Sequence, residues 1–381
     1  MKKVFSKNKI NLGYILPILL IALLIAFPRD SIDGAKRGIN IVFNSLLPSL
    51  LPFFVCSRLL INMGFAEEIG KFYAPVMRKI FNTPGAGSFA FFMGSLSGYP
   101  LGAKIASDMY DNGLCTKTEA ERLLTFCNNS GPVFVIGVVG ISMLNSQACG
   151  MFLYLIHIIA SVSTGIIFSR YKASYPQGLN YTQNHALKRQ KKYNLGEIVS
   201  ESVKSSVLTM AEIGGYIIFF SSAISLLEKT GFIHMLSKVL LTFGVSPSAA
   251  PGMAQGLFEI SRGIEVLSKS NASPEYISFI LSFSGISVIL QVSGIIKSKL
   301  SLKAFIAGKL IHAAFAMLYA KAAIHLMQSV FYIKTFSQYS GTVSDKLQTP
   351  WLTSLLMLFT ALLVFTVGAA ALKRSKTTPN I

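Results

Sequence analysis

The chain has 381 residues, of which 52% are hydrophobic and only 13% charged, and its mean hydropathy is +0.54. This composition excludes an ordinary soluble domain and is typical of a polytopic membrane protein. The formal charge of +19 would suggest nucleic acid as a partner in a soluble protein. Here most Lys and Arg residues flank apolar stretches, where they set topology and meet anionic lipid, so we expect contact with the lipid bilayer and none with nucleic acid.

Eight apolar stretches are predicted to cross the membrane as helices, because each approaches the roughly 20 residues that a span needs. They begin near residues 12, 39, 123, 149, 207, 275, 303 and 350. A lysine-rich segment, 1–9, precedes the first stretch, and no small-residue cleavage pattern follows it. We therefore expect an uncleaved first span, with the N-terminus and the C-terminus both in the cytoplasm.

Two further apolar segments are interrupted by polar residues, glycine and proline. The first, 84–108, is interrupted at Ser97-Gly98-Tyr99-Pro100, and the second, 248–271, at Glu259-Ile260-Ser261-Arg262-Gly263. Half-segments of about a dozen residues rise only about 18 Å, too little to cross a core of roughly 30 Å. We expect two re-entrant helical hairpins here. The spans beginning at 123 and 275 are also interrupted, at residues 128–132 and 282–285.

The second half repeats the order of parts in the first. Phe53 matches Phe220, Thr83-Pro84 matches Ser246-Pro247, and an amphipathic segment occurs in each half, at 66–81 and 232–243. With the positive-inside rule, this order predicts an inverted-topology repeat, in which a midplane site alternates its access. The expected divisions are an N-terminal span at 1–38, a first repeat at 39–169, a basic cytoplasmic linker at 170–198, an inverted second repeat at 199–300, and C-terminal spans with a basic tail at 301–381.

Polar groups at these interruptions predict a solute site. The second half of each broken helix begins at the break, so its free N–H groups and positive dipole end favour an anionic group. The predicted substrate-binding residues are Ser95, Ser97, Gly98, Tyr99, Asn128, Asn129, Ser130, Gly131, Gln255, Glu259, Ser261, Ser282 and Ser284, with Lys104 and Arg262 as possible charge balance. The alternative is plain packing, since Gly94, Gly98 and Gly102 form G-x-x-x-G pairs that let helices approach closely.

Ionisable residues inside apolar segments are functional by default. We expect Glu259 to be a carboxylate that couples transport to a proton or sodium ion, or a substrate contact. Arg262 either contacts substrate or pairs with a neighbouring glutamate. The four cysteines show no metal spacing, and we expect no metal or other cofactor. The remaining intramembrane cations and histidines are expected to pack or to form hydrogen bonds inside the bundle; they are His157, Lys309, His312 and Lys321.

Motifs of energy-coupled or catalytic proteins are absent from the sequence. The stretch Gly98–Lys104 is one residue short of a phosphate loop, and Ile105 stands where Ser or Thr must bind magnesium. Neither G-x-S-x-G nor H-E-x-x-H occurs. We therefore expect any transport to be secondary and the protein not to be an enzyme.

Four motifs carry a resemblance to a known family: Ser97–Lys104, Phe126–Pro132, Gly256–Glu259 and Ser282–Val292. On these the chain resembles the YlbJ (SpoVV) family of sporulation integral membrane proteins, which carry the nucleoside-recognition Gate domain. The resemblance implies an endospore-forming bacterium, a place in the outer forespore membrane, and distant kinship with concentrative nucleoside transporters, whose paired hairpins and broken helices enclose substrate. The family reads hydrophobic-Thr-x-Gly after the hairpin glutamate, whereas this chain has Ile260–Gly263, which keeps a hydroxyl at Ser261.

We therefore expect an all-α polytopic membrane protein with about eight transmembrane helices and two re-entrant hairpins. The expected function is secondary transport of a small anionic solute, and the resemblance implies dipicolinic acid moving from mother cell towards forespore. Two alternatives stay open. One is a symporter of a nucleoside or other small metabolite, and the other is a spore-envelope assembly protein that transports nothing. The sequence leaves the oligomeric state open.

Overall fold

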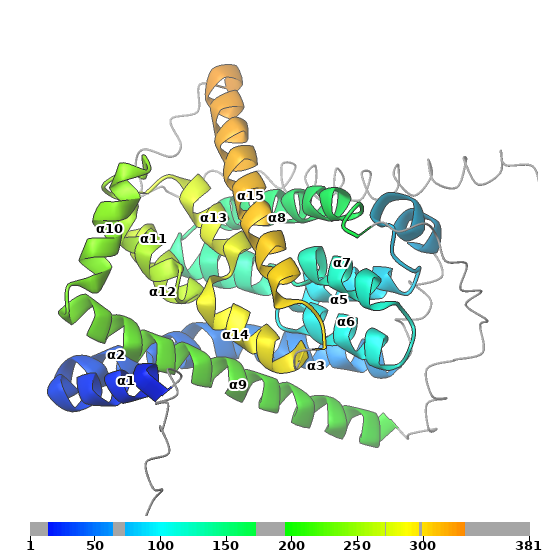
Figure 1. Cartoon of the computed structure of the whole chain (residues 1–381), viewed down its shortest axis with the longest axis horizontal. Coiled ribbons are helices and arrows are strands. Elements are labelled where there is room, and N and C mark those ends of the chain that lie inside the picture. The colour runs from blue at the N-terminus through cyan, green and yellow to red at the C-terminus, as the bar shows by residue number, and fades with distance from the viewer. Residues whose placement is uncertain (1–13, 64–72, 173–194, 271, 297–298, 332–381) are drawn as a thin grey trace, which may run out of the picture.

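The computed structural model describes residues 14–63, 73–172, 195–270, 272–296 and 299–331, and this part of the chain contains helices and no strands (Figure 1). The first half contains α1 (Ile15–Ala26), α2 (Pro28–Ile41), η2 (Val42–Leu46), α3 (Leu47–Asn62), η3 (Met77–Phe81), α5 (Gly87–Ser97), α6 (Leu101–Asp111), α7 (Lys117–Cys127), η4 (Val133–Met143) and α8 (Gln147–Phe168). The second half contains α9 (Leu195–Lys229), α10 (Phe232–Thr242), α11 (Ala250–Gly256), α12 (Ile260–Lys269), α13 (Pro274–Phe283), α14 (Gly285–Ile296) and α15 (Leu302–Phe331).

The all-α membrane class is confirmed, with fewer spans than the predicted eight. Four helices of the described residues are long and apolar enough to cross a membrane: Gln147–Phe168, Leu195–Lys229, Pro274–Ile296 and Leu302–Leu326. A fifth span is present if the pair Ile15–Ala26 and Pro28–Leu46, bent by 103°, counts as one. The four agree with the spans predicted to begin at residues 149, 207, 275 and 303.

The other predicted spans differ for reasons visible in the chain. The stretch from residue 12 turns at Phe27, because a proline follows and disfavours helical geometry in the residue before it. The stretch from residue 39 continues a helical path that begins at Pro28 and runs through α2, η2 and α3. The stretch from residue 123 is divided into α7 and η4 by the polar break. The stretch at 350–372 lies outside the described residues.

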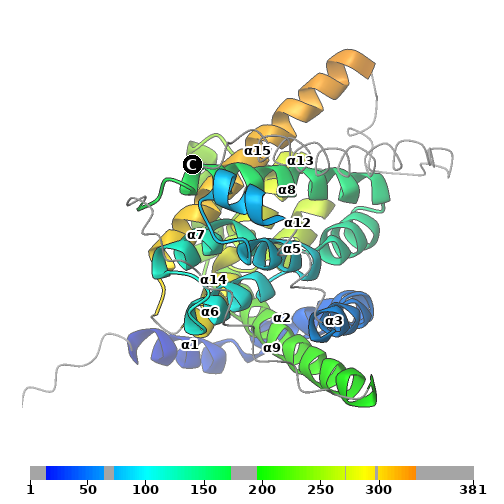
Figure 2. The ribbon, with the colours of Figure 1, turned by 90° about the vertical axis from the view of Figure 1, so that its right-hand side faces the viewer.

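Helices α1, α2, η2, α3 and α9 form one layer, and the remaining helices pack on one side of it (Figures 1 and 2). Within this layer α2 lies directly against α9. A Cβ on Gly34 would lie 2.5 Å from Ser225 Oγ, so only glycine allows this approach. Arg37 Nη2 and Ser31 Oγ add hydrogen bonds to the hydroxyls of Ser225 and Ser222, of 2.5 and 3.1 Å.

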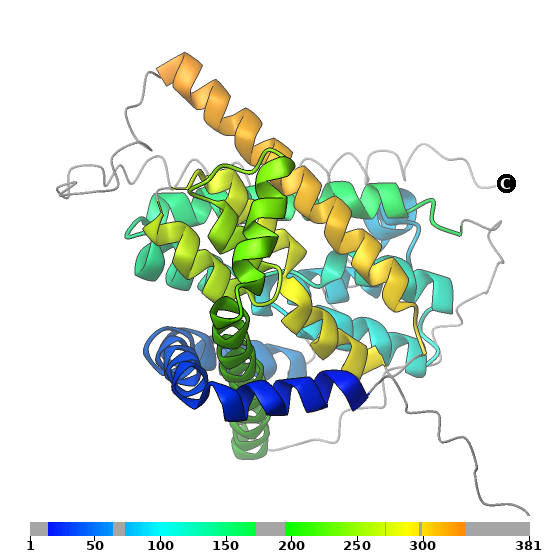
Figure 3. The same cartoon turned by 60° about the vertical axis from the view of Figure 1, so that its left-hand side comes forward.

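The second layer contains the same order of elements twice. A hairpin is followed by a broken helix and then by a long helix: α5/α6, α7/η4 and α8 in the first half, and α11/α12, α13/α14 and α15 in the second. The halves interlock, because α14 packs on α6 and η4 packs on α12. The long helix α15 runs obliquely across the molecule, and its last turns extend beyond the other described helices (Figure 3).

The predicted divisions fall at recognisable places, although the structure does not test them as domains. The boundary after residue 38 lies inside α2, the one after 169 follows α8, the one after 198 lies inside α9, and the one after 300 separates α14 from α15. The amphipathic segment predicted at 232–243 is α10. Of the segment predicted at 66–81, residues 73–81 are described, and they end in η3. Most of the predicted linker, 173–194, lies outside the described residues.

Candidate functional site

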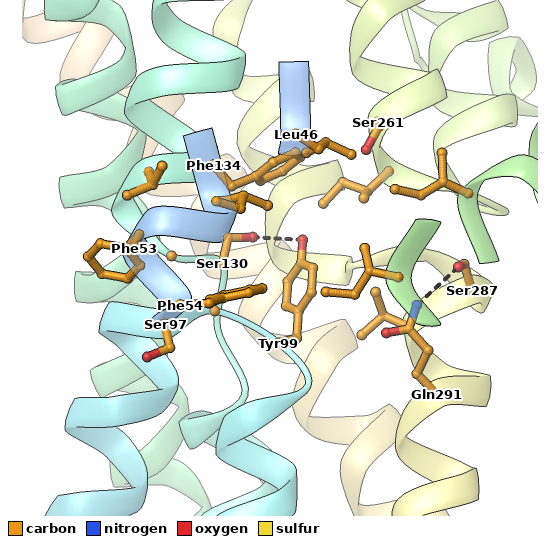
Figure 4. Close-up of a pocket in the computed structure, with 18 of the residues that line it drawn as sticks. Leu46, Phe53, Phe54, Ser97, Tyr99, Ser130, Phe134, Ser261, Ser287 and Gln291 are labelled. Atoms are coloured by element: carbon orange, nitrogen blue, oxygen red, sulfur yellow. Dashed lines mark hydrogen bonds between the residues drawn. The ribbon is translucent and has the colours of Figure 1, made fainter. Parts of the chain in front are cut away.

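A cavity of about 50 Å³ lies between the two layers, where the breaks of both halves meet (Figure 4). Apolar residues of η2, α3 and α9 line one side: Leu46, Leu50, Phe53, Phe54, Ile213 and Ile217. The breaks and the helices beside them line the other side, with Leu96, Ser97, Gly98, Tyr99, Ser130, Gly131, Val133, Phe134, Glu259, Ile260, Ser261, Ser287, Val288 and Gln291. A single water needs about 10–15 Å³, so this conformation has room for only a few waters.

The tip of the first hairpin supplies an aromatic ring and hydroxyls to this cavity. Gly98 has φ 82°, a left-handed conformation that turns the chain between α5 and α6. This turn carries Tyr99 to the break after α7, where Ser130 Oγ donates a hydrogen bond of 2.8 Å to the Tyr99 phenol oxygen (Figure 4). Ser97 Oγ is buried without a hydrogen-bond partner in the described part of the chain. The first half thus contributes hydroxyl groups beside an apolar wall.

The tip of the second hairpin places a carboxylate at the start of α12. Glu259 is 1% exposed, and its side chain accepts hydrogen bonds from the backbone N–H groups of Ser261 (3.1 Å) and Arg262 (2.8 Å). A carboxylate at this position is stabilised by the positive end of the helix dipole. The N-terminus of α12 is therefore occupied by the protein's own carboxyl group.

The starts of α6 and α14 are also capped, which differs from the free N-termini predicted from the sequence. Asn128 Oδ1 accepts from Ala103 N at 3.4 Å at the start of α6. At the start of α14, Ile286 N and Ser287 N donate to the carbonyls of Leu257 and Phe258, at 2.8 and 2.9 Å. No side chain caps η4, which begins directly after Pro132 and whose first residues line the cavity. Among these four starts, η4 has the N–H groups best placed to meet a solute.

Seven of the predicted site residues line the cavity: Ser97, Gly98, Tyr99, Ser130, Gly131, Glu259 and Ser261. Asn129 supports this site from behind. Its Nδ2 lies within hydrogen-bonding distance of Ser95 Oγ (3.1 Å), Phe126 O (2.9 Å) and Ser161 Oγ (3.0 Å). Asn129 therefore ties the break after α7 to α5 and α8.

The remaining predicted residues lie outside the lining and have other surroundings. Gln255 Nε2 donates to Glu228 Oε1 at 2.6 Å, and Ser282 Oγ lies 2.9 Å from His157 Nδ1. Ser284 has φ 74° at the break before α14. The two cations pair with carboxylates of their own helices, Lys104 with Asp108 at 2.6 Å and Arg262 with Glu265 at 2.9 Å. Direct contact of these residues with a solute stays a prediction.

The glycine pairs of the first hairpin serve close packing as well as the turn. A Cβ on Gly94 or Gly102 would collide with the carbonyl oxygen of Cys127. Both glycines therefore let α5 and α6 press against the end of α7. Close packing is the role that the G-x-x-x-G spacing indicated as the alternative to a solute site. The same packing holds Tyr99 beside Ser130.

Several residues of the cavity were missed by the sequence reasoning. Phe53, Phe54 and Phe134 form aromatic walls, and Ser287 and Gln291 extend the polar surface along α14. The i, i+4 spacing of Ser287 and Gln291, directly after a helix break, is a signal that they share one helix face. Arg58 lines a second, smaller cavity of about 20 Å³, which shares Phe54, Ser97, Gly98 and Tyr99 with the first.

No cluster of three or more His, Cys, Asp or Glu residues that could hold a metal ion occurs in the part of the chain that the structure describes. His157 and His312 are instead hydrogen-bonded inside the bundle. Ser130 N donates to His157 Nε2 at 3.0 Å, and His312 Nε2 donates to the His157 carbonyl at 2.9 Å. Lys321 is exposed on α15.

Comparison with known proteins identifies the family of this chain. A family model described as Gate, nucleoside recognition, matches residues 43–173. The sporulation integral membrane protein YlbJ of Bacillus subtilis (strain 168) is 32% identical over 324 residues, which cover 79% of each chain. The chain belongs to the YlbJ family of sporulation integral membrane proteins. No solved structure matches it.

The Gate match places part of the cavity inside a recognition domain of this YlbJ-family protein. Residues 43–173 run from η2 to the end of α8, and they include Tyr99 and Ser130. The Gate domain indicates recognition of a small molecule within a membrane. The second-half residues of the cavity, Glu259 to Gln291, lie beyond that match.

Proposed function

We propose that this protein is a secondary transporter of a small anionic solute, with dipicolinic acid as the candidate. We place it in the outer forespore membrane, where it moves the solute from the mother cell towards the forespore. The observation that carries the proposal is the cavity at which the broken helices of both halves meet. In secondary transporters, substrates bind near the midplane at the repeat interface, among discontinuous helices.

The lining of the cavity fits a planar aromatic ring with polar substituents. Phe53, Phe54, Phe134 and Tyr99 supply aromatic walls. Aromatic rings stack or meet edge to face at centroid separations of about 4.5–7 Å. The Tyr99 O–H, whose oxygen accepts from Ser130, and the Gln291 amide lie among these walls and supply hydrogen-bond donors. A few placed polar groups in an apolar pocket are the usual basis for orienting a small ligand.

The charges near the cavity support an anion, provided that Glu259 is neutralised. Its carboxylate is held by the N-terminal N–H groups of α12, which offset the negative charge. Arg58 lines the adjoining cavity together with the shared residues Ser97 and Tyr99, and it supplies a cation there. A guanidinium can hold a carboxylate by two parallel hydrogen bonds.

A nucleoside is the second candidate, because one observation favours a neutral solute. The carboxylate of Glu259 and the amide of Gln291 both line the cavity, and a carboxylate repels an anion while it accepts hydrogen bonds from neutral hydroxyl or amino groups. The family model that matches residues 43–173 is described as nucleoside recognition. The two candidates differ in the charge of the solute and can be separated by competition.

The size of the cavity implies that transport requires movement. A volume of about 50 Å³ holds a few waters, so neither dipicolinate nor a nucleoside fits without displacement of the walls. The apolar wall belongs to the layer of α3 and α9, and the polar wall belongs to the helices with breaks. Separation of the two layers would enlarge the site.

Uptake by proteoliposomes tests the function. Purified protein should take up labelled dipicolinate, and unlabelled dipicolinate should compete more strongly than uridine. Stronger competition by uridine would favour the nucleoside candidate. No uptake of either solute by protein with a normal melting curve would favour a spore-envelope assembly protein that transports nothing. Cysteine labelling of each terminus in intact cells tests the proposed cytoplasmic placement of both ends.

A further inference from the structure

Lys309 on α15 is a lysine buried in the middle of the helix bundle. Its side chain is among the largest fully buried ones, with 1% of its surface exposed. Its Nζ donates a hydrogen bond to the backbone carbonyl of Asn128, the first residue of the break between α7 and η4. No carboxylate pairs with Lys309 within the described ranges. Its amino group is thus met by a backbone carbonyl rather than by a carboxylate.

Close packing of α15 on α7 places Lys309 at this position. A Cβ on Gly308 would lie 2.7 Å from the Cα of Thr125, so the two backbones touch at the last turn of α7. The next residue along α15 then reaches the end of α7. The titratable side chains around Lys309 in the described part of the chain include Cys127, His157 and His312, none of which carries a carboxylate.

The end of α7 has the chemistry of a cation site. The C-terminus of a helix carries a partial negative charge on its last carbonyl groups. Phe126 O accepts from Asn129 Nδ2 (2.9 Å) and Ser161 Oγ (2.7 Å), and Asn128 O accepts from Lys309 Nζ. In secondary transporters, unwound carbonyls and half-helix C-termini coordinate coupling cations. The lysine ammonium is a compact, strongly hydrated point charge, and so resembles a monovalent ion.

We propose that the Lys309 ammonium is a tethered cation, which holds the position at the end of α7 that a free sodium ion would otherwise occupy, so that solute movement needs no sodium. The statement about transport rests on the proposed function. The statement about cation binding rests on the geometry of α7 and α15 alone, and it is measured without any solute.

The test compares melting temperatures of the full chain in detergent, in sodium chloride and in choline chloride of equal ionic strength. Lys309→Ala vacates the position, and Lys309→Ser vacates it while adding an oxygen ligand. The matched control is Lys321→Ala, an exposed lysine of the same helix. Wild type and control should melt equally in both salts. Both variants at position 309 should have a lower melting temperature than the wild type in choline chloride. Their melting temperature should rise with the logarithm of the sodium concentration, because an ion that binds the native state stabilises it by mass action.

Three results would overturn the inference. The first is a wild type that sodium stabilises over choline. The second is a pair of folded variants at position 309 that are indifferent to sodium. The third is failure of both variants to fold even when sodium is present throughout purification, since the ion should replace the missing ammonium.

Uptake distinguishes this inference from the proposed function. Wild-type proteoliposomes should take up dipicolinate equally with sodium or choline outside. Uptake that requires sodium would overturn the inference and leave the transporter proposal intact. The absence of all uptake would contradict the transporter proposal, and the melting experiment would still decide whether Lys309 replaces a cation.

Discussion

Ser130 Oγ donates a hydrogen bond of 2.8 Å to the phenol oxygen of Tyr99, and this contact joins the tip of the first hairpin to the break after α7. Both residues also line the cavity. The first hairpin and the broken helix α7/η4 therefore meet the solute space as one unit. A ligand that enters the cavity lies beside this pair.

Tyr99→Phe keeps the aromatic wall and removes the hydroxyl. We expect the KM for dipicolinate to rise about fivefold, the effect of losing one hydrogen bond of about 1 kcal/mol. The melting temperature should change little, because Ser130 Oγ keeps a second contact with the Leu281 carbonyl at 3.4 Å. Tyr319→Phe is the matched control, since it breaks another tyrosine–serine bond of 3.0 Å that lies outside the cavity lining. Equal effects of the two changes on uptake would contradict a role at the cavity.

Arg58→Gln removes the cation of the smaller cavity. Hydrogen bonds to charged groups contribute about 1.5–3 kcal/mol, so we expect dipicolinate uptake to fall about tenfold or more. Binding of uridine, which is neutral, should be unchanged. Competition assays on proteoliposomes measure both, with Lys321→Gln as a control for loss of an exposed cation. A parallel loss of both solutes would show that Arg58 acts on the fold rather than on an anion.

Glu259→Gln removes a negative charge from the cavity and from the start of α12. The favourable interaction of an anion with a helix N-terminus is about 0.3–1 kcal/mol, so the variant should be slightly less stable to heat. Affinity for dipicolinate should rise relative to uridine, because repulsion between carboxylates is lost. Glu265→Gln is the control, since that carboxylate is on the same helix but pairs with Arg262 and Lys269. A folded Glu259→Gln variant without any uptake would indicate a coupling carboxylate instead.

Asn129→Ala should reduce stability rather than solute affinity. The amide lies against acceptors on α5, α7 and α8, and leaving buried polar groups without a partner costs about 1–3 kcal/mol. Thermal unfolding in detergent measures the loss, and Asn112→Ala, at an exposed asparagine, is the control. Protein that melts normally but no longer binds solute would place Asn129 in direct contact with the ligand.

The helix breaks were predictable because polar residues with glycine and proline inside an apolar run have few physical explanations. Ser97–Pro100, Asn128–Pro132 and Glu259 all lie at breaks of the described helices. The long unbroken spans α8, α9 and α15 were predictable from the length of their apolar stretches alone.

The partners of several buried polar groups were not predictable, because they come from residues far apart in the chain. Asn129 meets Ser161 across 32 residues, and Lys309 meets the Asn128 carbonyl across 181. The aromatic wall was not predicted, because Phe53 and Phe54 are typical residues of an apolar membrane span. The cap of α6 was not predicted, because the start of a half-helix in the sequence does not show whether a distant residue, here Asn128, caps it.

The glycine and serine contact between α2 and α9 has a practical consequence for anyone who shortens the chain. A protein that begins after residue 38 would lose Ser31, Gly34 and Arg37, and would present the hydroxyl-bearing face of α9 to lipid. Hydroxyl groups that lose their partners in hydrocarbon carry a cost in free energy, so the truncated protein should be less stable. Expression trials should therefore keep the N-terminal segment whole.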